Sequence, residues 1–314
     1  MSDDLIDVGV IDRSTYLGSS DVAAIMGVSK YATPLDVYMA KVEPLDEPVD
    51  LDRARILRRG HVLEPYIVQM MVEQLRRDGH EVEVVGQGRR LRHPEHDFLA
   101  AEIDCELLVD GELCNGEAKS AGWRAAEEWG EAGTDEIPIH YGAQVHHAQI
   151  VTGRRTTWVG ALFGLDDCVM YRVDADDELH AEILSRMVAF WHDHVLARVP
   201  PDPVRIEDVH RLYRRSGPPP VEASPEILDH VQALRAIRAK IRALEDEAAE
   251  HQFAIAAYMA ESDELVSGGQ TILTFRHQVR RVVDAKRLKA ERPDIFNAYA
   301  RDSQSRPILF KRGK

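Results

Sequence analysis

The 314-residue sequence predicts an α/β protein with a helical and basic extension at its C-terminal end. Apolar and polar residues alternate over 98–109, as expected of a half-buried strand, whereas apolar residues recur at helical spacing over 53–78. Proline clusters within 199–224 separate this part from a long helical pattern over 225–261. The expected domains are an α/β core at 1–198, a Pro-rich linker at 199–224, and a long helix plus basic segment at 225–314.

Capping residues and apolar periodicity predict the helices. A serine cap starts the first helix, which Gly27 ends, and Thr33 followed by Pro34 matches the preferred start of the second. Gly79 ends the amphipathic helix that begins near residue 53. In chain order, the helices are predicted at 21–26, 34–42, 53–78, 123–129, 139–151, 176–198, 225–261 and 283–289.

Alternating apolar runs predict the strands. Asp110-Gly111 lies between two such runs and is a two-residue hairpin signal, because both residues tolerate positive φ. This hairpin returns its second strand beside its first. In chain order, the strands are predicted at 81–92, 98–109, 112–119, 156–163, 168–174, 270–276 and 306–310.

The formal net charge of −15 counts against a nucleic-acid partner, because lysine and arginine contacts to phosphate dominate such binding. The charge is unevenly spread, however, since residues 271–314 carry about +8 and the remaining residues about −23. We therefore expect basic tracks on an acidic body.

The sequence contains no apolar run of membrane-spanning length, no signal peptide and only three scattered cysteines, so a cytoplasmic protein without membrane contact is expected.

The spacing of Asp104, twelve residues, and then Glu117-Ala118-Lys119 is the feature with the clearest chemistry. The hairpin brings Asp104 and Glu117 close together, and two carboxylates suit an oxygen-preferring cation such as Mg²⁺. Strand alternation puts Glu117 and Lys119 on one face, where the lysine can hold a water or neutralise charge on a phosphate. These residues predict metal-dependent phosphodiester cleavage. The alternative is a surface hairpin whose charges are solvated.

This motif resembles the core of PD-(D/E)XK nucleases, with Ile103 where many members have proline. Residues 18–34, 59–65 and 141–153 resemble, in the same order, segments of the YqaJ-type viral recombinase family, phage exonucleases related to lambda exonuclease. The resemblance implies a restriction-endonuclease-like PD-(D/E)XK core, in which helices flank a central mixed sheet.

The resemblance also implies the roles of individual residues. The metal, Mg²⁺ with Mn²⁺ expected to substitute, would be bound by Asp104, Glu117 and the main-chain carbonyl of Ala118. The expected catalytic residues are Lys119, Glu64 and Gln144. Lys119 would orient or deprotonate the attacking water, and Glu64 would bind metal or position that water. Gln144 has no titratable proton and would act by positioning.

Lambda-type members hold the 5′-phosphate with an arginine and serines near the chain start, and Arg13 and Ser20 match that pattern. The serine expected two residues before the metal-binding aspartate is Glu102 here. A carboxylate at this position would repel a terminal phosphate unless it points away. Glu102 therefore weakens the expectation of strict 5′-phosphate dependence.

The function implied is a Mg²⁺-dependent DNA exonuclease of phage-type recombination, acting 5′ to 3′ on double-stranded ends, in the host cytoplasm if phage-encoded. A homo-oligomer and a single-strand annealing protein as partner are also implied. The alternatives are an endonuclease or structure-specific nuclease on the same core, or a non-catalytic protein that binds DNA ends or a partner. The basic C-terminal segment is expected to contact DNA through Arg280, Arg281, Lys286, Arg287 and Lys289.

Overall fold

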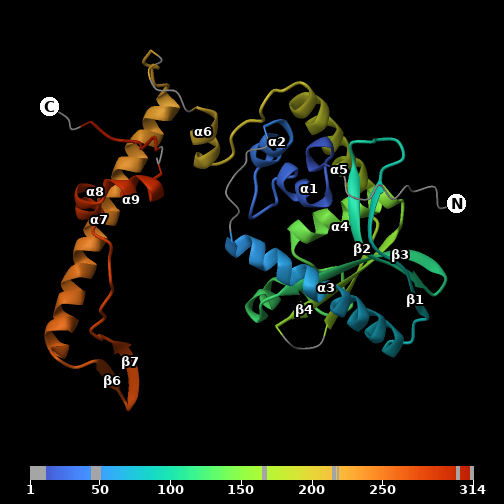
Figure 1. Ribbon diagram of the computed structural model, residues 1–314, viewed down its shortest axis with the longest axis horizontal. Coiled ribbons are helices and arrows are strands. Elements are labelled where there is room, and N and C mark those ends of the chain that lie inside the picture. Colours follow the sequence, from blue (N-terminus) through green and yellow to red (C-terminus); the bar gives the residue numbers. More distant parts are fainter. Residues whose placement is uncertain are drawn as a thin grey trace. The chain divides into compact units, whose positions relative to one another are not determined.

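The structure, a computed structural model, describes residues 12–43, 51–164, 168–213, 217, 219–301 and 305–311. The chain divides into two compact units, Met1–Leu212 and Tyr213–Lys314 (Figure 1). The first unit contains every site residue predicted from the sequence except the five in the basic C-terminal segment. Among the described residues, no helix has the length and apolar character needed to cross a membrane.

A five-stranded mixed sheet forms the centre of the first unit, with the strands in the order β1-β2-β3-β4-β5. The pairs β1–β2, β2–β3 and β4–β5 are antiparallel, whereas β3 and β4 are parallel and are connected through a helix. The central mixed sheet expected from the family resemblance is thus confirmed. The strands are β1 (Val82–Arg92), β2 (Ala100–Val109), β3 (Glu112–Ala121), β4 (Thr156–Phe163) and β5 (Cys168–Asp174).

Helices cover both faces of this sheet (Figure 1). The second helix starts as predicted: the Asp36 main-chain N–H donates to the Thr33 hydroxyl, and the Thr33 main-chain N–H donates to the Asp36 carboxylate. The helical elements of this unit are η1 (Arg13–Thr15), α1 (Ser19–Ile25), α2 (Pro34–Val42), α3 (Leu51–Arg77), η2 (Trp123–Glu128), α4 (Ile139–Thr152), α5 (Asp177–Phe190), η3 (Trp191–Leu196) and α6 (Ile206–Leu212).

The apolar core lies in two layers on either side of the sheet. On one side, α3 packs Ile67 and Met71 against buried residues of β2 and β4. The close approach of α3 requires Gly160 on β4, because a Cβ there would lie 2.3 Å from Met71 Cγ. On the other side, α1, α4 and α5 pack against the N-terminal half of β2. The two layers fix α3 and α4 on opposite sides of the β2–β3 pair.

Several elements differ from the sequence-based predictions. The helix predicted at 176–198 ends its α-helical part at Phe190 and continues as the π-helical turn η3. The strand predicted at 306–310 is absent from the described segment 305–311, which has no ladder partner. The predicted linker 199–224 contains the helix α6, so the first compact unit extends to Leu212. Residues 214–216 and 218 of that linker lie outside the described residues.

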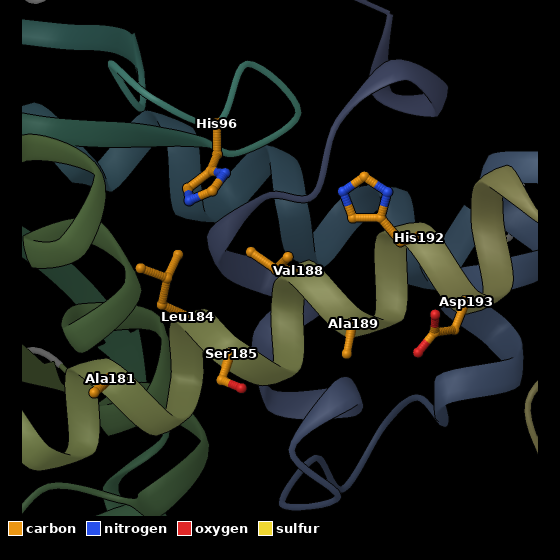
Figure 2. Close-up of a pocket in the computed structure, with 8 residues that line it drawn as sticks. All are labelled: His96, Ala181, Leu184, Ser185, Val188, Ala189, His192 and Asp193. Atoms are coloured by element: carbon orange, nitrogen blue, oxygen red, sulfur yellow. The ribbon is translucent and has the colours of Figure 1, made fainter.

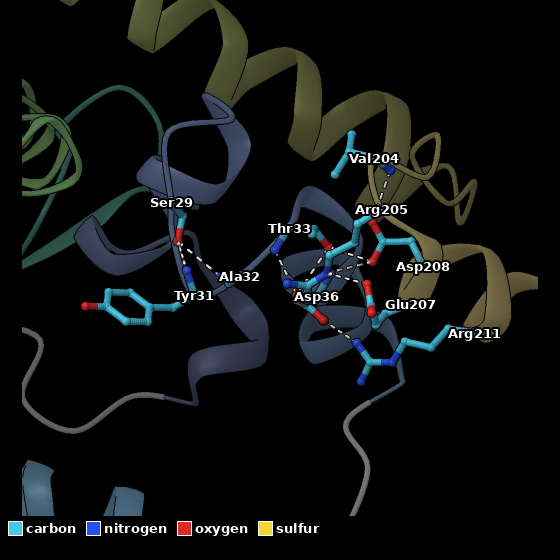
Figure 3. Close-up of polar contacts among 10 residues, drawn as sticks. All are labelled: Ser29, Tyr31, Ala32, Thr33, Asp36, Val204, Arg205, Glu207, Asp208 and Arg211. Atoms are coloured by element: carbon cyan, nitrogen blue, oxygen red, sulfur yellow. Dashed lines mark hydrogen bonds and ion pairs between the residues drawn. The ribbon is translucent and has the colours of Figure 1, made fainter. Parts of the chain in front are cut away.

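Polar contacts hold α6 against α2 and its N-terminal cap (Figure 3). Asp208 is fully buried and accepts hydrogen bonds from the Thr33 hydroxyl at 3.0 Å and the Val204 main-chain N–H at 3.1 Å. Arg205 and Arg211 both pair with Asp36 on α2. A seven-residue helix between prolines gives little periodic signal, so these long-range contacts, rather than local propensity, explain α6.

The second unit consists of a long helix and a basic C-terminal segment. Ser224 caps the 35-residue helix α7, because its hydroxyl accepts the Ile227 main-chain N–H at 3.3 Å. A short hairpin follows, and then two helices whose side chains are largely exposed. The elements are α7 (Pro225–Met259), β6 (Glu264–Ser267), β7 (Gln270–Thr274), α8 (Ala285–Glu291) and α9 (Pro293–Tyr299).

Candidate active site

The candidate site lies where strands β2 and β3 separate. Their hairpin turn has φ of 50° at Asp110 and 85° at Gly111, the signature of a type I′ turn. The ladder that starts there ends at the Cys105–Gly116 pair, and the next residues along are Asp104 and Glu117. On its other side β3 pairs with β4 from Asn115 to Ala121, and the Ala118 main-chain N–H donates to Asp104 Oδ2 at 2.8 Å. The Asp104 carboxylate therefore accepts a main-chain hydrogen bond at the point where strands β2 and β3 separate.

Strand β2 also changes faces at Asp104. Residues two apart in a regular strand share a face. Ile103, however, packs in the apolar layer of α1, α4 and α5, whereas Cys105 packs in the layer of α3. Gly88 lies across from this point on β1 and has a φ of 59°, which residues with a side chain rarely adopt. The irregularity turns Asp104 toward β3.

Lys119 connects this carboxylate pair with helix α4. Its Nζ lies 2.5 Å from Glu117 Oε1 and donates to Gln144 Oε1 at 3.2 Å. The same ammonium lies 4.8 Å from the centre of the Tyr141 ring, close enough for a cation–π contact. Glu117 and Lys119 thus share the β3 face that looks toward α4. Sequence analysis missed Tyr141, although its position three residues before Gln144 puts both on one helix face.

The charges of these groups influence each other strongly. Burial raises the pKa of Asp104 well above its ordinary value, and the neighbouring negative charge of Glu117 raises it further. Burial alone would lower the pKa of Lys119, but the charges of Glu117 and Asp104 outweigh burial and leave that pKa above its ordinary value. Lys119 is therefore a charged ammonium at neutral pH. Two crowded carboxylates facing one cation form an arrangement that a further cation would stabilise.

Glu64 is a third carboxylate near this pair, on helix α3. Burial raises its pKa, and the charges of Glu102 and Glu117 contribute in the same direction. Its Oε2 lies 3.7 Å from Nδ1 of His61, one turn earlier on the same helix. Among the described residues, no group of three or more His, Cys, Asp and Glu side chains is arranged to hold a metal ion. The site therefore presents two close carboxylates with a third nearby.

The predicted phosphate-binding pair, Arg13 and Ser20, comes together at the start of the same strand. Arg13 Nη2 donates to the Ser20 hydroxyl at 2.7 Å, and both side chains are accessible. The intervening Leu17 bonds to the chain just before β2, donating to the Phe98 carbonyl at 2.7 Å and accepting from Ala100 N–H at 3.1 Å. From Ala100 to Asp104 along the strand is a distance of roughly 13 Å.

Glu102, where the family pattern has serine, is paired with a cation. Its Oε2 lies 2.8 Å from Arg90 Nη2 on the neighbouring strand β1, and more than half of its side chain is exposed. The expected repulsion of a phosphate is therefore reduced, because the negative charge of Glu102 is largely offset by Arg90.

Lys41 is a buried lysine that sequence analysis did not single out. Its ammonium pairs with Asp21 Oδ2 at 2.8 Å and donates to the main-chain carbonyl of Arg13 at 2.7 Å. Lys41 therefore fixes the backbone that carries Arg13. A lysine on the apolar face of α2 is the only sequence signal that could have revealed it.

His147 on α4 contacts Ser19 of α1, the neighbour of Ser20. It is fully buried, and its Nδ1 lies 3.1 Å from the Ser19 hydroxyl. Burial lowers the pKa of His147 to about 4. The folded protein therefore contains neutral His147, whereas the unfolded chain binds a proton below about pH 6.5. The contribution of neutral His147 to the free energy of unfolding is complete above about pH 6.5 and is lost as the pH falls toward 4.

We expect the wild-type protein to lose about 2 kcal/mol of unfolding free energy between pH 7.5 and pH 5 because of His147. A His147→Gln variant should lose correspondingly less over the same range, since glutamine does not titrate. Urea unfolding at both pH values measures the difference. His61→Gln is the matched control, because His61 is largely exposed. An equal acid loss in wild type and His147→Gln would contradict this assignment.

The remaining predicted site residues lie in the second unit and are exposed. Arg280 and Arg281 precede α8 without regular structure. Within α8, Arg287 pairs with Glu291 at 2.8 Å, and Lys289 lies 5.5 Å from the Phe296 ring. Lys286 is exposed on the same helix. These side chains form a short basic segment.

A surface depression elsewhere contains none of the predicted site residues. Figure 2 shows His96, from the loop between β1 and β2, above one side of α5 and η3. The lining is largely apolar, with Leu184 and Val188 at its centre and His192 at one end. The depression is therefore separate from the carboxylate–lysine cluster formed by Asp104, Glu117 and Lys119.

The fold and this cluster define an α/β protein whose carboxylates and lysine meet where two strands of a mixed sheet separate. Residues 10–155 match the family described as the YqaJ-like viral recombinase domain. This match confirms the family resemblance predicted from the sequence. All predicted site residues of the first unit fall within the matched range.

The chain is similar to a protein of Bacillus subtilis and to solved exonuclease structures. Protein YqaJ of Bacillus subtilis strain 168, described as uncharacterized, is 25% identical over 312 residues, covering 97% of this chain and 94% of that protein. The crystal structure of LHK-Exo, an alkaline exonuclease from Laribacter hongkongensis, has 21% identity and a TM-score of 0.44, covering 64% of this chain and 95% of that chain. The crystal structure of LHK-Exo with dAMP gives the same values.

Proposed function

We propose that this protein is a metal-dependent DNA exonuclease that acts 5′ to 3′ on double-stranded ends in phage-type recombination. The observation that carries the proposal is the opening of the β2–β3 ladder at Asp104 and Glu117, with Lys119 2.5 Å from Glu117. Two carboxylates and one ammonium at a strand opening suit phosphodiester hydrolysis. The match to the viral recombinase domain family supports a role on DNA.

The donor set fits Mg²⁺, with Mn²⁺ as a substitute. Asp104, Glu117 and the main-chain carbonyl of Ala118 would hold it, because all three donors are oxygens, which both cations prefer. The raised pKa of Asp104, caused by burial and by the charge of Glu117, indicates a repulsion that a divalent cation relieves. When bound, the metal would supply Lewis-acid polarisation of the phosphate and a lower pKa for water.

The side chains around the metal would then carry out the remaining steps. Lys119, held by Gln144 and the Tyr141 ring, would orient the attacking water and offset charge that develops on the phosphate. Glu64, whose pKa is raised by burial, would accept a proton near the site. Gln144 would act by fixing Lys119.

The preference for a 5′-end would come from Arg13 and Ser20. Their side chains already meet at 2.7 Å, and an arginine fork with a hydroxyl suits a terminal phosphate. The pairing of Glu102 with Arg90 removes most of the repulsion that Glu102 would otherwise exert. The basic segment with Arg280, Arg281, Lys286, Arg287 and Lys289 would add sequence-independent duplex contacts. A single-strand annealing protein is proposed as a partner.

End-labelled duplex DNA distinguishes this function from its alternatives. The full-length protein with Mg²⁺ should remove a 5′-label from linear duplex before a 3′-label, should leave closed circles intact, and should be inactive in EDTA. 5′-phosphorylated ends should be degraded faster than 5′-hydroxyl ends. Arg13→Ala should abolish that preference, whereas the exposed Arg124→Ala should retain it.

Each other outcome points to a different function. Cutting of closed circles would identify an endonuclease. Binding of DNA ends without cleavage under any metal condition would identify a non-catalytic DNA-binding protein. Equal rates on 5′-phosphorylated and 5′-hydroxyl ends would remove the proposed role of Arg13 and Ser20 while leaving the cleavage site in place.

A further inference from the structure

Helix α7 carries a largely apolar stripe, most of which the described residues of the second unit leave exposed. From Ile227 to Tyr258, the stripe repeats with alternating steps of three and four residues, the spacing of a two-helix seam. Its remaining positions hold Ala248 and two histidines, His230 and His251. In the middle of the helix, Ile237 and Ile241 are about half exposed. The other aliphatic residues of this seam are Leu234, Leu244 and Ile255.

The charges beside the seam are divided between the two halves of the helix. Arg238 and Lys240 flank it in the first half, and Glu245 and Glu247 flank it in the second half. Within the described part of the chain, none of these four has an ion-pair partner. A long helix with an exposed seam and unpaired flanking charges of opposite sign lacks a partner helix.

We infer that α7 pairs with the α7 of a second copy of this chain, in antiparallel orientation. When the midpoints of the two stripes are aligned, Ile241 faces the partner's Leu244, and Ile237 faces the partner's Ala248. The same register places Arg238 beside the partner's Glu245 and Lys240 beside the partner's Glu247. Two-fold symmetry repeats each contact, so the pairing forms four ion pairs along a seam of roughly 47 Å.

Parallel pairing fits the same helix less well. It would put the first, basic half of one helix beside the basic half of the other, and the acidic half beside the acidic half. Only Lys240 and the partner's Glu245 would then meet across the seam, and Arg238 would face an alanine. The flanking charges therefore favour the antiparallel arrangement, as such charges do in coiled coils.

The C-terminal segment of the same chain leaves the middle of the seam exposed. Phe310 lies against Arg235 and Arg238, with its ring 4.9 and 5.0 Å from their guanidinium carbons. Arg238 also donates to the Ile308 main-chain carbonyl at 3.3 Å. These contacts occupy one flank of α7, and the seam residues Ile237, Ile241 and Leu244 remain about half or more exposed.

Charge reversal in the full-length chain, without DNA, tests the pairing independently of nuclease function. Sedimentation equilibrium should show that the wild type self-associates. Arg238→Glu with Lys240→Glu should weaken self-association by at least about 100-fold, because four attractive pairs become repulsive. Glu245→Lys with Glu247→Lys should do the same. An equimolar mixture of these two double variants should associate with wild-type affinity, because all four pairs are restored between them.

The matched control is Arg235→Glu with Arg242→Glu, which changes the net charge equally on the outer side of α7. This control also removes an arginine from Phe310, so it reproduces the loss of that intrachain contact. It should associate like wild type. Self-association of either seam variant at wild-type strength, or failure of their mixture to recover it, would overturn the inference.

Disulfide trapping tests the orientation. A chain with both Ile237→Cys and Ala248→Cys should cross-link to its partner under mild oxidation, whereas Ala248→Cys alone should not. In the antiparallel register the two copies of residue 248 are about 16 Å apart along the helix axis. The natural cysteines Cys105, Cys114 and Cys168 are buried and do not interfere. Cross-linking by Ala248→Cys alone would establish a parallel pair and overturn the proposal.

Discussion

Replacing Asp104 with asparagine is expected to reduce DNA cleavage to less than about a tenth of the wild-type rate while leaving the fold intact. Asparagine keeps an oxygen that can accept the Ala118 main-chain N–H, now bonded at 2.8 Å to Asp104 Oδ2. It removes the negative charge that a divalent cation needs. Stability should stay equal or rise, because burial and Glu117 already disfavour the charged form of Asp104.

Alanine at the same position separates the two roles of the side chain. Asp104→Ala should be equally inactive but less stable than Asp104→Asn by about 1–3 kcal/mol, because the Ala118 N–H loses its acceptor. Glu117→Ala should also be inactive. Cleavage of labelled linear duplex and urea unfolding measure the two effects. Glu112→Ala is the control, since it removes an exposed carboxylate from β3, the strand of Glu117. More than a tenth of wild-type activity in both alanine variants would refute the metal assignment.

Lys119→Ala is expected to slow turnover by about 100-fold or more with little change in DNA affinity. The ammonium contacts Glu117 and Gln144 at the strand opening and is charged at neutral pH, so its loss removes a localised positive charge from the site. Single-turnover cleavage and a separate binding assay in EDTA distinguish rate from affinity. Lys30→Ala is the matched control, because Lys30 is an exposed lysine paired with Glu128.

The shape of the cation should matter as well as its charge. Lys119→Arg is expected to restore little activity, because a planar guanidinium cannot occupy the compact position between Glu117, Gln144 and the Tyr141 ring. Gln144→Ala should have a smaller effect than Lys119→Ala, since it loosens Lys119 without removing it. Wild-type turnover in Lys119→Arg would mean that Lys119 contributes only diffuse positive charge.

Much of the fold could be predicted because its signals are local. Asp110-Gly111 determines a type I′ turn through the φ values that its two residues adopt, and Thr33-Pro34 determines the start of α2. By contrast, α6 could not be predicted, because it depends on the buried Asp208 and on two arginines that pair with Asp36. The strand predicted at 306–310 is wrong because a strand needs a ladder partner, which no local pattern supplies.

The sequence by itself determined the family resemblance, the carboxylate–lysine motif and the order of the elements around it, because spacing and periodicity act within a few residues. Only the tertiary structure decided how those residues meet. The separation of β2 from β3 at Asp104, the contact of Lys119 with Gln144 and the pairing of Glu102 with Arg90 all depend on strand register and helix packing. Such contacts join segments far apart in the chain, and their geometry is fixed only when the whole core packs.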